Sequence, residues 1–487
     1  MEVLQRTANR GSISTGYNID NSLKLEKDNN EHLYRVMVEG NRKTWTYSCW
    51  IKRTELLQVN AQVLIHFGVN HHATRMFIDD NNDQIYLDVC STENTLYRSI
   101  TNRRFRDTSA WYHIVWRMDT TQGTEADRMR LYINGVEETS WSQHQIPPQN
   151  LETLANTTAG GYDDMGIGTY VWAGSSFDGQ FSGYIAQVAH VDGQSYAPTE
   201  FGEFDDDSGI WKPKDVSGLT YGTSNNSFFL DFETASDLGA NAKGNDVNFS
   251  LNNITAADQA TDTPTNNFCT LNVIANIENN AVVFTEGATV GSVSGGGNVS
   301  DHAMATMGFS SGKWYYEAYV TTGSTNDDAM FGFANPDGWY QGLGNDTFSA
   351  GAHNVGRWYY NSNTFTTTGA TTWDKGDIVQ IAIDCDNGKC WSGVNGTYSS
   401  GDPSTNTGGF DWDANVTDMS IGDLVIPVTR VLYTAPGTTY YNFGGYTLIP
   451  ISSAASDANG YGTFEYAPPT GFYAICGKNL AEYGGTA

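Results

Sequence analysis

Basic residues, paired cysteines and long apolar runs are all scarce in this chain of 487 residues. Lys and Arg total 26 against 55 Asp and Glu, which gives a formal net charge of −29. Because a surface of that sign repels phosphates, nucleic acid is not expected as a partner. No run of about 18 apolar residues occurs, so the sequence predicts no membrane span.

The six cysteines are scattered, without the Cys-x-x-Cys spacing of a zinc site. Cys385 and Cys390 flank a predicted turn, which makes a cross-strand disulfide geometrically conceivable. Two small buried thiols are the favoured alternative, because a protein made in a reducing cytoplasm seldom relies on disulfides.

The first residues, MEVLQRTANRGSIST, lack the apolar core of a secretory signal peptide. Residues 1–14 are polar and unpatterned, so they are interpreted as a tail. The alternative is a short peptide that attaches the chain to a larger assembly such as a virion.

What the chain does have points to an all-β fold. It contains 52 glycines and 13% aromatic residues, with only 17% charged residues. No stretch shows the i, i+3, i+4, i+7 apolar spacing of an amphipathic helix. This composition favours many short strands and tight turns over long helices. Together with the two family resemblances described below, it leads us to expect two antiparallel β-sandwich domains in series, with very little helix.

The clearest strand pattern lies between Lys375 and Tyr398, where apolar and polar residues alternate. Asn387-Gly388 then favours a two-residue type I′ turn, because both residue types tolerate a positive φ. This turn places Cys385 opposite Cys390 in a β-hairpin. The hairpin resembles the core of SPRY domains, which are β-sandwich binding modules.

Further matches to the SPRY pattern follow in the expected order around this hairpin. They are Gly312–Glu317 (GKWYYE), Gly332–Ala334, Pro427 and Asn442–Gly444. Several ordered matches are more specific than one short motif. The resemblance implies that residues 268–445 form one sandwich.

A second resemblance covers the first half of the chain. Trp45–Lys52, Trp111–Gly135 and Phe177–Val188 resemble three strand patterns of concanavalin A-like, laminin G-type domains. The resemblance implies two antiparallel sheets packed face to face over residues 15–255, with ligand loops at one end or on the concave face. Residues 256–267 are interpreted as a linker and residues 446–487 as a C-terminal extension.

The linker string at Asn252–Phe268 and the tail string at Pro469–Leu480 resemble those of fibre or appendage proteins of tailed bacteriophages. This implies a non-enzymatic virion protein, assembled in the host cytoplasm and later exposed outside the cell. Its partners would be other virion proteins and a host-surface glycan or protein, and it would form a homo-oligomer, a trimer by analogy. A capsid or neck decoration protein, or head fibre, is the alternative, and a secreted glucanase-like enzyme is the third.

Exposed aromatic side chains are the candidates for ligand contact, because sugar rings stack on them. Trp339, Tyr340 and Trp358 fall in predicted loops of the SPRY-like unit, and Trp172 lies in a Gly-rich stretch of the first unit. Ordinary packing at the rim of a sandwich is the favoured alternative for each.

No cofactor is expected, but one stretch resembles the start of a calcium loop. Asp79, Asn81 and Asp83 offer oxygens at alternate positions. A hairpin turn is favoured, because the sixth-position Gly and the twelfth-position Glu of such a loop are missing.

Catalytic residues are not expected in this sequence. Retaining glucanases of this fold carry a Glu-x-Asp-x-x-Glu string on one strand. The nearest string here, Asp231–Asp237, matches neither in residue types nor in spacing. Because fold alone does not carry activity, the sequence predicts no enzyme.

Overall fold

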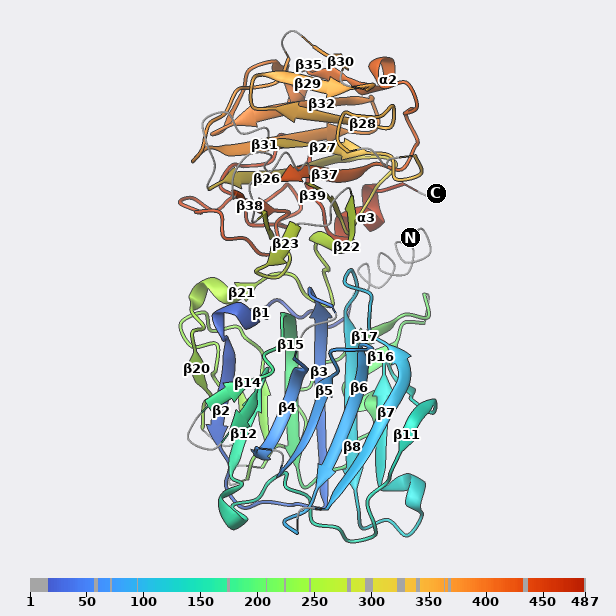
Figure 1. Cartoon of the computed structure of the whole chain (residues 1–487), viewed down its shortest axis with the longest axis vertical. Coiled ribbons are helices and arrows are strands. Elements are labelled where there is room, and N and C mark those ends of the chain that lie inside the picture. The colour runs from blue at the N-terminus through green and yellow to red at the C-terminus, as the bar shows by residue number, and fades with distance from the viewer. Residues whose placement is uncertain are drawn as a thin grey trace. The chain divides into compact units, whose positions relative to one another are not determined.

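The regular secondary structure of the computed structural model is mostly antiparallel strand, which confirms the predicted all-β class. The chain divides into two compact units, Ser14–Thr265 and Asn266–Ala487, called here the N-terminal and C-terminal units (Figure 1). The structure describes residues 16–56, 60–70, 72–93, 95–172, 176–206, 208–222, 225–244, 247–277, 282–293, 301–321, 329–338, 342–362, 364–366, 369–431 and 437–485.

The N-terminal unit is a sandwich of a nine-stranded and an eight-stranded sheet. Figure 1 shows them as separate layers, with β5 and β6 in one and β3 and β15 in the other. The nine-stranded sheet contains β1 (Ser22–Leu25), β3 (Thr44–Arg53), β8 (Tyr112–Asp119), β9 (Met129–Ile133), β10 (Val136–Glu137), β15 (Gly183–Asp192), β18 (Phe228–Leu230), β19 (Lys243–Gly244) and β21 (Gln259–Ala260). The eight-stranded sheet contains β2 (His32–Val36), β4 (Gln62–Val69), β5 (His72–Ile78), β6 (Gln84–Cys90), β7 (Leu96–Arg104), β11 (Trp141–His144), β12 (Asp164–Ile167) and β20 (Ser250–Asn252).

Short elements complete this unit. Two hairpins lie outside the main sheets, β13 (Tyr170–Trp172) with β14 (Ser176–Asp178), and β16 (Gly202–Phe204) with β17 (Trp211–Pro213). The single-turn 3-10 helices are η1 (Lys27–Asn29), η2 (Glu125–Asp127), η3 (Ala159–Gly161), η4 (Pro198–Glu200) and η5 (Ala256–Asp258).

The core between the two sheets follows the alternation of the sequence. On β3, Trp45, Tyr47, Cys49 and Ile51 all point into the core, as their spacing predicts. Trp50 points the other way and stacks on His113, with ring centroids 4.6 Å apart. The outer side of the nine-stranded sheet therefore also carries aromatic residues that need cover.

That cover comes from the chain itself. Phe201 and Val216, from the segment between β15 and β18, form an apolar cluster with Val115, Ala189 and Phe229 of the sheet. From the same segment, Trp211 donates its indole N–H to Nδ1 of His113 at 2.9 Å. The outer face of the nine-stranded sheet is thus packed against residues of its own unit.

The stretch predicted as a linker is packed within the N-terminal unit as far as Thr265. β21 pairs with β1, and the Asp262 side chain is fully buried. Asp262 accepts hydrogen bonds from Lys52 Nζ at 2.7 Å and from Trp111 Nε1 at 3.0 Å. A polar, unpatterned segment is ordered here because its acid neutralises a buried lysine, so the boundary falls after Thr265 rather than across 256–267.

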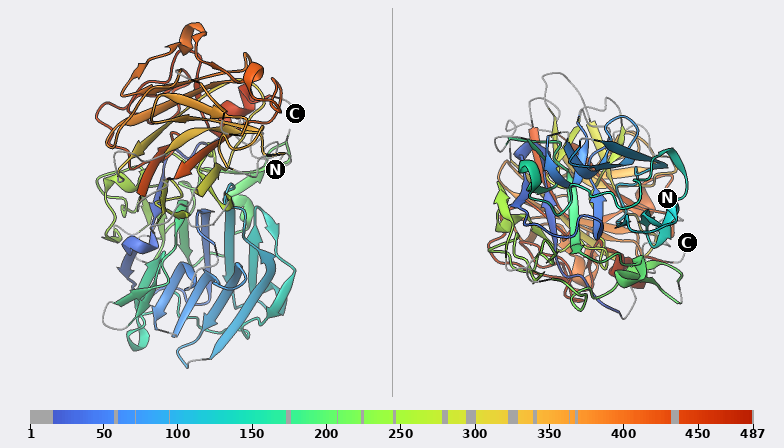
Figure 2. Two further views of the ribbon diagram at one scale, coloured as in Figure 1. Left: turned by 45° about the horizontal axis from the view of Figure 1, so that its top comes forward. Right: turned by 90° about the horizontal axis from the view of Figure 1, so that it is seen from below.

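The C-terminal unit is a second sandwich, of a seven-stranded and a nine-stranded sheet (Figure 2). The seven-stranded sheet contains β22 (Leu271–Ile277), β25 (Asp301–Ala305), β27 (Met330–Ala334), β28 (Ser349–His353), β29 (Arg357–Tyr360), β30 (Thr364–Phe365) and β37 (Ile426–Val431). The nine-stranded sheet contains β23 (Val282–Thr285), β24 (Val290–Val293), β26 (Lys313–Val320), β31 (Ile378–Asp384), β32 (Lys389–Val394), β33 (Thr397–Tyr398), β36 (Phe410–Asp411), β38 (Gly437–Asn442) and β39 (Tyr473–Ala474). The remaining elements are β34 (Gly401–Asp402) with β35 (Thr407–Gly408), η6 (Pro403–Thr405), α2 (Trp412–Asn415) and α3 (Gly477–Tyr483).

The predicted hairpin exists as β31 and β32, but its register differs from the prediction by two residues. Cys390 lies opposite Ile383, not opposite Cys385. The turn is longer because the Asp384 carboxylate accepts the backbone N–H groups of Asp386 and Asn387, each at 3.1 Å. A shift of two residues leaves each side chain on its predicted face. Cys385 and Cys390 are both buried free thiols.

The C-terminal extension belongs to the C-terminal unit. Phe464 and Phe472 pack with Tyr315 and Trp391 on the outer side of the nine-stranded sheet. The carboxylate of Glu317, fully buried on β26, accepts the backbone N–H groups of the extension at residues 465 and 466. The extension therefore covers the outer side of this sheet, in the way that Phe201, Trp211 and Val216 cover the nine-stranded sheet of the N-terminal unit.

Replacing Asp262 tests the role of the segment after η5. Asp262→Ala leaves the buried ammonium of Lys52 without this counter-charge, so we expect a loss of about 3–5 kcal/mol in the free energy of unfolding of the N-terminal unit. The exposed Asp206→Ala variant is the control, with an expected change within about 0.5 kcal/mol. Urea unfolding of the full chain measures both. Equal stability of the two variants would contradict the packed position of residues 256–265.

Buried neutral histidine makes the N-terminal unit sensitive to acid. His113 accepts from Trp211 at Nδ1, so its other nitrogen carries the proton and donates to Ser48 Oγ at 2.9 Å. Burial lowers the pKa of His113 from 6.5 to about 3. The unfolded state therefore binds the extra proton between those values, and stability falls as the pH drops below 6.5.

This contribution is measured with the His113→Gln variant, whose amide keeps one donor and one acceptor. The variant is less stable than the natural protein at pH 7.5, and we expect its deficit to shrink by about 2–3 kcal/mol at pH 4.5, at roughly 1.36 kcal/mol per pH unit. Chemical unfolding at the two pH values gives the difference. A deficit that is the same at both would show that His113 is not held neutral.

Candidate ligand-binding face of the N-terminal unit

The outer side of the eight-stranded sheet carries a cluster of rings and charges on three adjacent strands. Alternation on β5 and β6 sends Met76, Ile78, Ile85, Leu87 and Val89 into the core. Their neighbours therefore point outward. The ring–arginine face consists of Arg75, Phe77, Tyr86, Asp88 and Arg98, together with Tyr170 from the β13–β14 hairpin.

Strand register brings two arginines onto one carboxylate. Arg75 on β5 and Arg98 on β7 both lie directly opposite Asp88 on β6. Arg75 donates from Nε at 2.9 Å, and Arg98 donates from Nε at 2.6 Å and from Nη2 at 2.8 Å. Asp88 is completely buried beneath them, whereas 31% of the Arg98 side chain is exposed. Two guanidinium groups share one carboxylate, so the cluster carries one positive charge in excess.

Aromatic rings surround this positive charge. Phe77 and Tyr86 stack with centroids 5.0 Å apart. The Arg75 guanidinium lies 5.3 Å from the Phe77 ring and 4.9 Å from the Tyr170 ring, and that of Arg98 lies 5.4 Å from Tyr86. Such contacts hold the planar guanidinium groups in fixed positions. Arg75 and Phe77 are buried, so the part of the face that can offer N–H donors and ring surface consists of Arg98, Tyr86 and Tyr170, which are partly exposed.

His66 lies beneath the same face but adds no charge to it. Its Nε2–H donates to the Gly68 carbonyl at 3.1 Å, and its ring meets Tyr170 edge to face. Burial first, and then the neighbouring Arg75, lower the pKa of His66 to about 3. The hydrogen bond with Asp88 raises the pKa of Arg98. The positive charge of the face is therefore constant across the neutral pH range.

The four residues predicted to contact a ligand lie in different environments, and two of them lie outside the described residues. Trp172 lies two residues after Tyr170 on β13 and is half-buried. Trp339 and Tyr340 lie outside the described residues. Trp358 is 0% exposed, stacks on Phe410 and donates its indole N–H to the Gly369 carbonyl. Trp358 is therefore a core residue, and its prediction as a ligand contact is wrong, because alternation on β29 turns it inward.

The calcium candidate is built as a hairpin turn between β5 and β6. The Asp79 carboxylate accepts the backbone N–H groups of Asn81, Asn82 and Gln84. Asp83 is fully buried and bonds both Arg53, at 2.9 Å, and Arg106, at 2.7 Å. Among the described residues, Asp79 and Asp83 belong to no group of three acidic, His or Cys side chains close enough to share an ion. In the predicted ligand set, Asp79 thus bonds backbone N–H groups, Asp83 bonds two arginines, and the Asn81 side-chain amide donates to Asp80.

The carboxylates nearest to the glucanase pattern lie in a turn. Asp231 and Glu233 follow the end of β18, and the Asp231 side chain accepts the backbone N–H of Glu233 at 3.1 Å. The Asp231 charge raises the pKa of the exposed Glu233. Asp231 and Glu233 therefore do not share a strand, as the catalytic carboxylates of the glucanases do.

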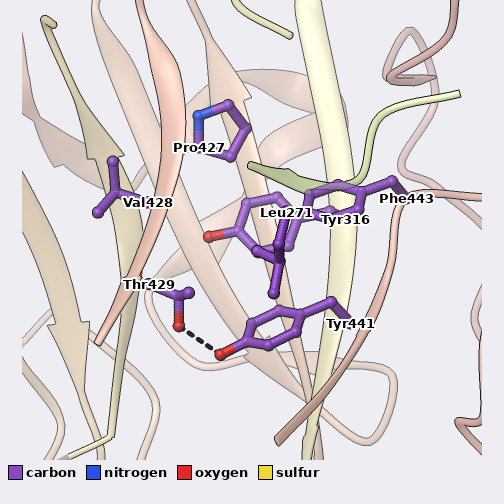
Figure 3. A pocket seen from close by; sticks show the side chains of 7 residues that line it. All are labelled: Leu271, Tyr316, Pro427, Val428, Thr429, Tyr441 and Phe443. Carbon is purple, nitrogen blue, oxygen red and sulfur yellow. Dashed lines mark hydrogen bonds between the residues drawn. The ribbon is translucent and has the colours of Figure 1, made fainter. Parts of the chain in front are cut away.

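A small pocket lies inside the C-terminal unit. Its roughly 170 Å³ of space between atoms includes open solvent and leaves essentially no room for a water molecule, whereas ligand sites occupy roughly 300–1,000 Å³. Figure 3 shows Tyr441 on one side, with its hydroxyl group hydrogen-bonded to that of Thr429; the two oxygens are 2.6 Å apart. The pocket is a packing gap rather than a ligand site. Its walls are Leu271, Tyr316, Pro427, Val428, Thr429, Tyr441 and Phe443.

The residues that sequence reasoning missed are Arg75, Asp88 and Arg98. Alternating strings such as Arg75-Met76-Phe77 and Tyr86-Leu87-Asp88 indicate one polar strand face each. They do not indicate that these faces meet, because the pairing of β5, β6 and β7 decides which side chains are neighbours.

One family model matches part of the chain, and it covers the strands that carry the ring–arginine face. Residues 27–192 match the concanavalin A-like lectin/glucanases superfamily. A comparison with curated proteins found no match. Among the described residues, no helix has the length and apolar character needed to cross a membrane.

Several solved structures resemble parts of the chain. The SPRY domain of human HERC1 has 14% identity and a TM-score of 0.28, and the match covers 35% of this chain and 96% of that one. A human SPRY domain has 13% identity and a TM-score of 0.25, covering 33% and 94%. The heptameric SAP-like pentraxin from Limulus polyphemus has 16% identity and a TM-score of 0.26, covering 37% and 80%. Residues 27–192 are thus similar to the concanavalin A-like lectin/glucanases superfamily, and the residues of the ring–arginine face all lie within this matched range.

Proposed function

We propose that this chain is a non-enzymatic binding protein of a bacteriophage virion, carried as a fibre or appendage, that attaches to a host-surface glycan or protein. The observation that carries the binding role is the ring–arginine face. One outer face of the N-terminal unit is packed against the segment between β15 and β18, whereas the other leaves the Arg98 guanidinium and the rings of Tyr86 and Tyr170 partly exposed, above the buried Arg75 and Phe77. Rings stack on sugar faces, and guanidinium groups form strong hydrogen bonds with sugar and carboxylate oxygens.

The virion assignment is supported by the sequence. The strings at Asn252–Phe268 and Pro469–Leu480 resemble those of phage fibre and appendage proteins. The net charge of −29 suits a displayed protein that must stay soluble and avoid non-specific contacts. Several copies in a symmetric homo-oligomer, a trimer by analogy, turn a shallow site into strong attachment.

Binding is tested with the purified full chain on an array of bacterial surface glycans and on intact host cells. We expect Arg98→Ala and Tyr86→Ala each to weaken binding about tenfold or more, because roughly 1.4 kcal/mol of contact energy is lost. Arg130→Ala is the matched control, since Arg130 lies on the nine-stranded sheet and pairs with Asp127 and Glu137. Equal loss in the control and the two face variants would show that the ring–arginine face is not the binding site.

The place of the protein is tested on purified particles with an antibody against the chain. Labelling of fibres or appendages, together with blocked adsorption, supports attachment. Labelling of the capsid or neck with normal adsorption supports the decoration protein instead. Release of shorter sugars from any bound glycan would contradict the non-enzymatic role.

A further inference from the structure

A buried lysine of the N-terminal unit lies between two buried acids from distant parts of the chain. Lys24 on β1 donates from Nζ to the two Glu31 carboxylate oxygens at 3.0 and 2.9 Å, and Nζ lies 2.8 Å from Asp258 Oδ1. The exposed fractions of the three side chains are 1%, 3% and 7%. Burying one ammonium and two carboxyl groups together is costly, because the three groups cannot all be ionised and remain paired one to one.

We propose that Lys24 and Asp258 condense to an intramolecular amide bond, with Glu31 transferring the protons. This would be a covalent modification built by the fold itself. It joins β1, the first strand of the N-terminal unit, to η5 near the end of that unit. It is independent of the ligand that the ring–arginine face binds.

The two oxygens of Asp258 have different environments, as the reaction requires. Oδ2 accepts the backbone N–H of Thr255 at 2.7 Å and the Thr255 hydroxyl at 3.2 Å. These two donors would stabilise negative charge on Oδ2 when the carboxyl carbon becomes tetrahedral. Oδ1, which faces Lys24, is then the oxygen that leaves.

Glu31 is hydrogen-bonded to Lys24, and a carboxylate oxygen of Glu31 lies within 4.8 Å of one of Asp258, so it can exchange protons with Lys24 directly and is close to Asp258. Its carboxylate accepts the backbone N–H of Glu26 at 2.8 Å and the side-chain amide of Asn29 at 2.9 Å, in addition to Lys24. Burial raises the pKa of Glu31 to about 7, against the opposing effect of Lys24. A carboxyl group that titrates near neutral pH can both accept and return a proton.

The reaction balances without any further reagent. Glu31 takes a proton from the Lys24 ammonium, and the neutral amine attacks Cγ of Asp258. The Nζ–Cγ bond forms and the Cγ–Oδ1 bond breaks. Of the three protons of the ammonium group, one stays on the amide nitrogen. Glu31 passes the other two to Oδ1, which leaves as water. One positive and one negative charge disappear together, so the buried site keeps a single carboxyl group hydrogen-bonded to backbone and side-chain donors.

The chain contains a second buried pair for comparison. Lys52 Nζ lies 2.7 Å from Asp262 Oδ2, and both side chains are as deeply buried as Lys24. The other oxygen of Asp262 accepts from the Trp111 indole, which is not a proton relay. We therefore expect Lys52 and Asp262 to remain an ion pair, which makes them an internal control for proximity alone.

The test is the intact mass of the full-length protein, measured after denaturation. We expect a mass lower than that of the sequence by one water molecule. Protease digestion should release a branched peptide that joins the segments containing Lys24 and Asp258, which distinguishes the bond from dehydration within one segment. Glu31→Gln, which keeps the shape but not the proton relay, should show the full mass, and Asp262→Asn should still lack one water molecule.

The branched peptide decides the outcome even where a variant fails to fold, because it is sought in the natural protein. A natural protein at its full sequence mass would overturn the proposal. So would a branch that maps to Lys52. A folded Glu31→Gln variant that still lacks one water molecule would overturn the role of Glu31. If the bond forms, thermal unfolding of folded Lys24→Ala should occur at a lower temperature than that of the natural protein.

Discussion

The N-terminal unit depends on pairing buried cations with acids that lie far away along the chain. Lys52 and Arg53, at the end of β3, are both fully buried and bond Asp262 and Asp83. Removing one partner of such a pair leaves an uncompensated charge in a poorly polarisable interior. The pairs therefore determine where segments without apolar pattern must lie. This constraint orders residues 256–265 and brings Asp258 to Lys24.

In both units, one sheet has apolar side chains on its outer face as well as in the core. Each has one outer sheet face packed against a segment of its own chain, with Phe201 in the first unit and Phe464 in the second. In the N-terminal unit this leaves the eight-stranded sheet to carry the ring–arginine face. The choice of this face for the proposed binding role rests on packing rather than on any motif.

The differences between expectation and structure have local physical causes. Asp384 caps the turn after β31, so Asn387-Gly388 does not form the two-residue turn that its sequence favours. Asn395 and Gly396 do form such a turn, with φ values of 49° and 84°. Trp358 lies in a polar, aromatic string typical of a loop, yet β29 pairs with β28 and turns its ring into the core.

The all-β class, the presence of two units and the side chains that point into the core on strands such as β3 could be predicted from the sequence, because period-two alternation is a local property of the chain. It did not determine the end of the first unit, the register of the β31–β32 hairpin or the partners of the charged residues. Arg75, Asp88 and Arg98 become neighbours only when β5, β6 and β7 pair, and Lys24 meets Asp258 only when β1 pairs with β21. Contacts between residues distant in the chain depend on strand pairing and burial, and these are decided by the tertiary structure.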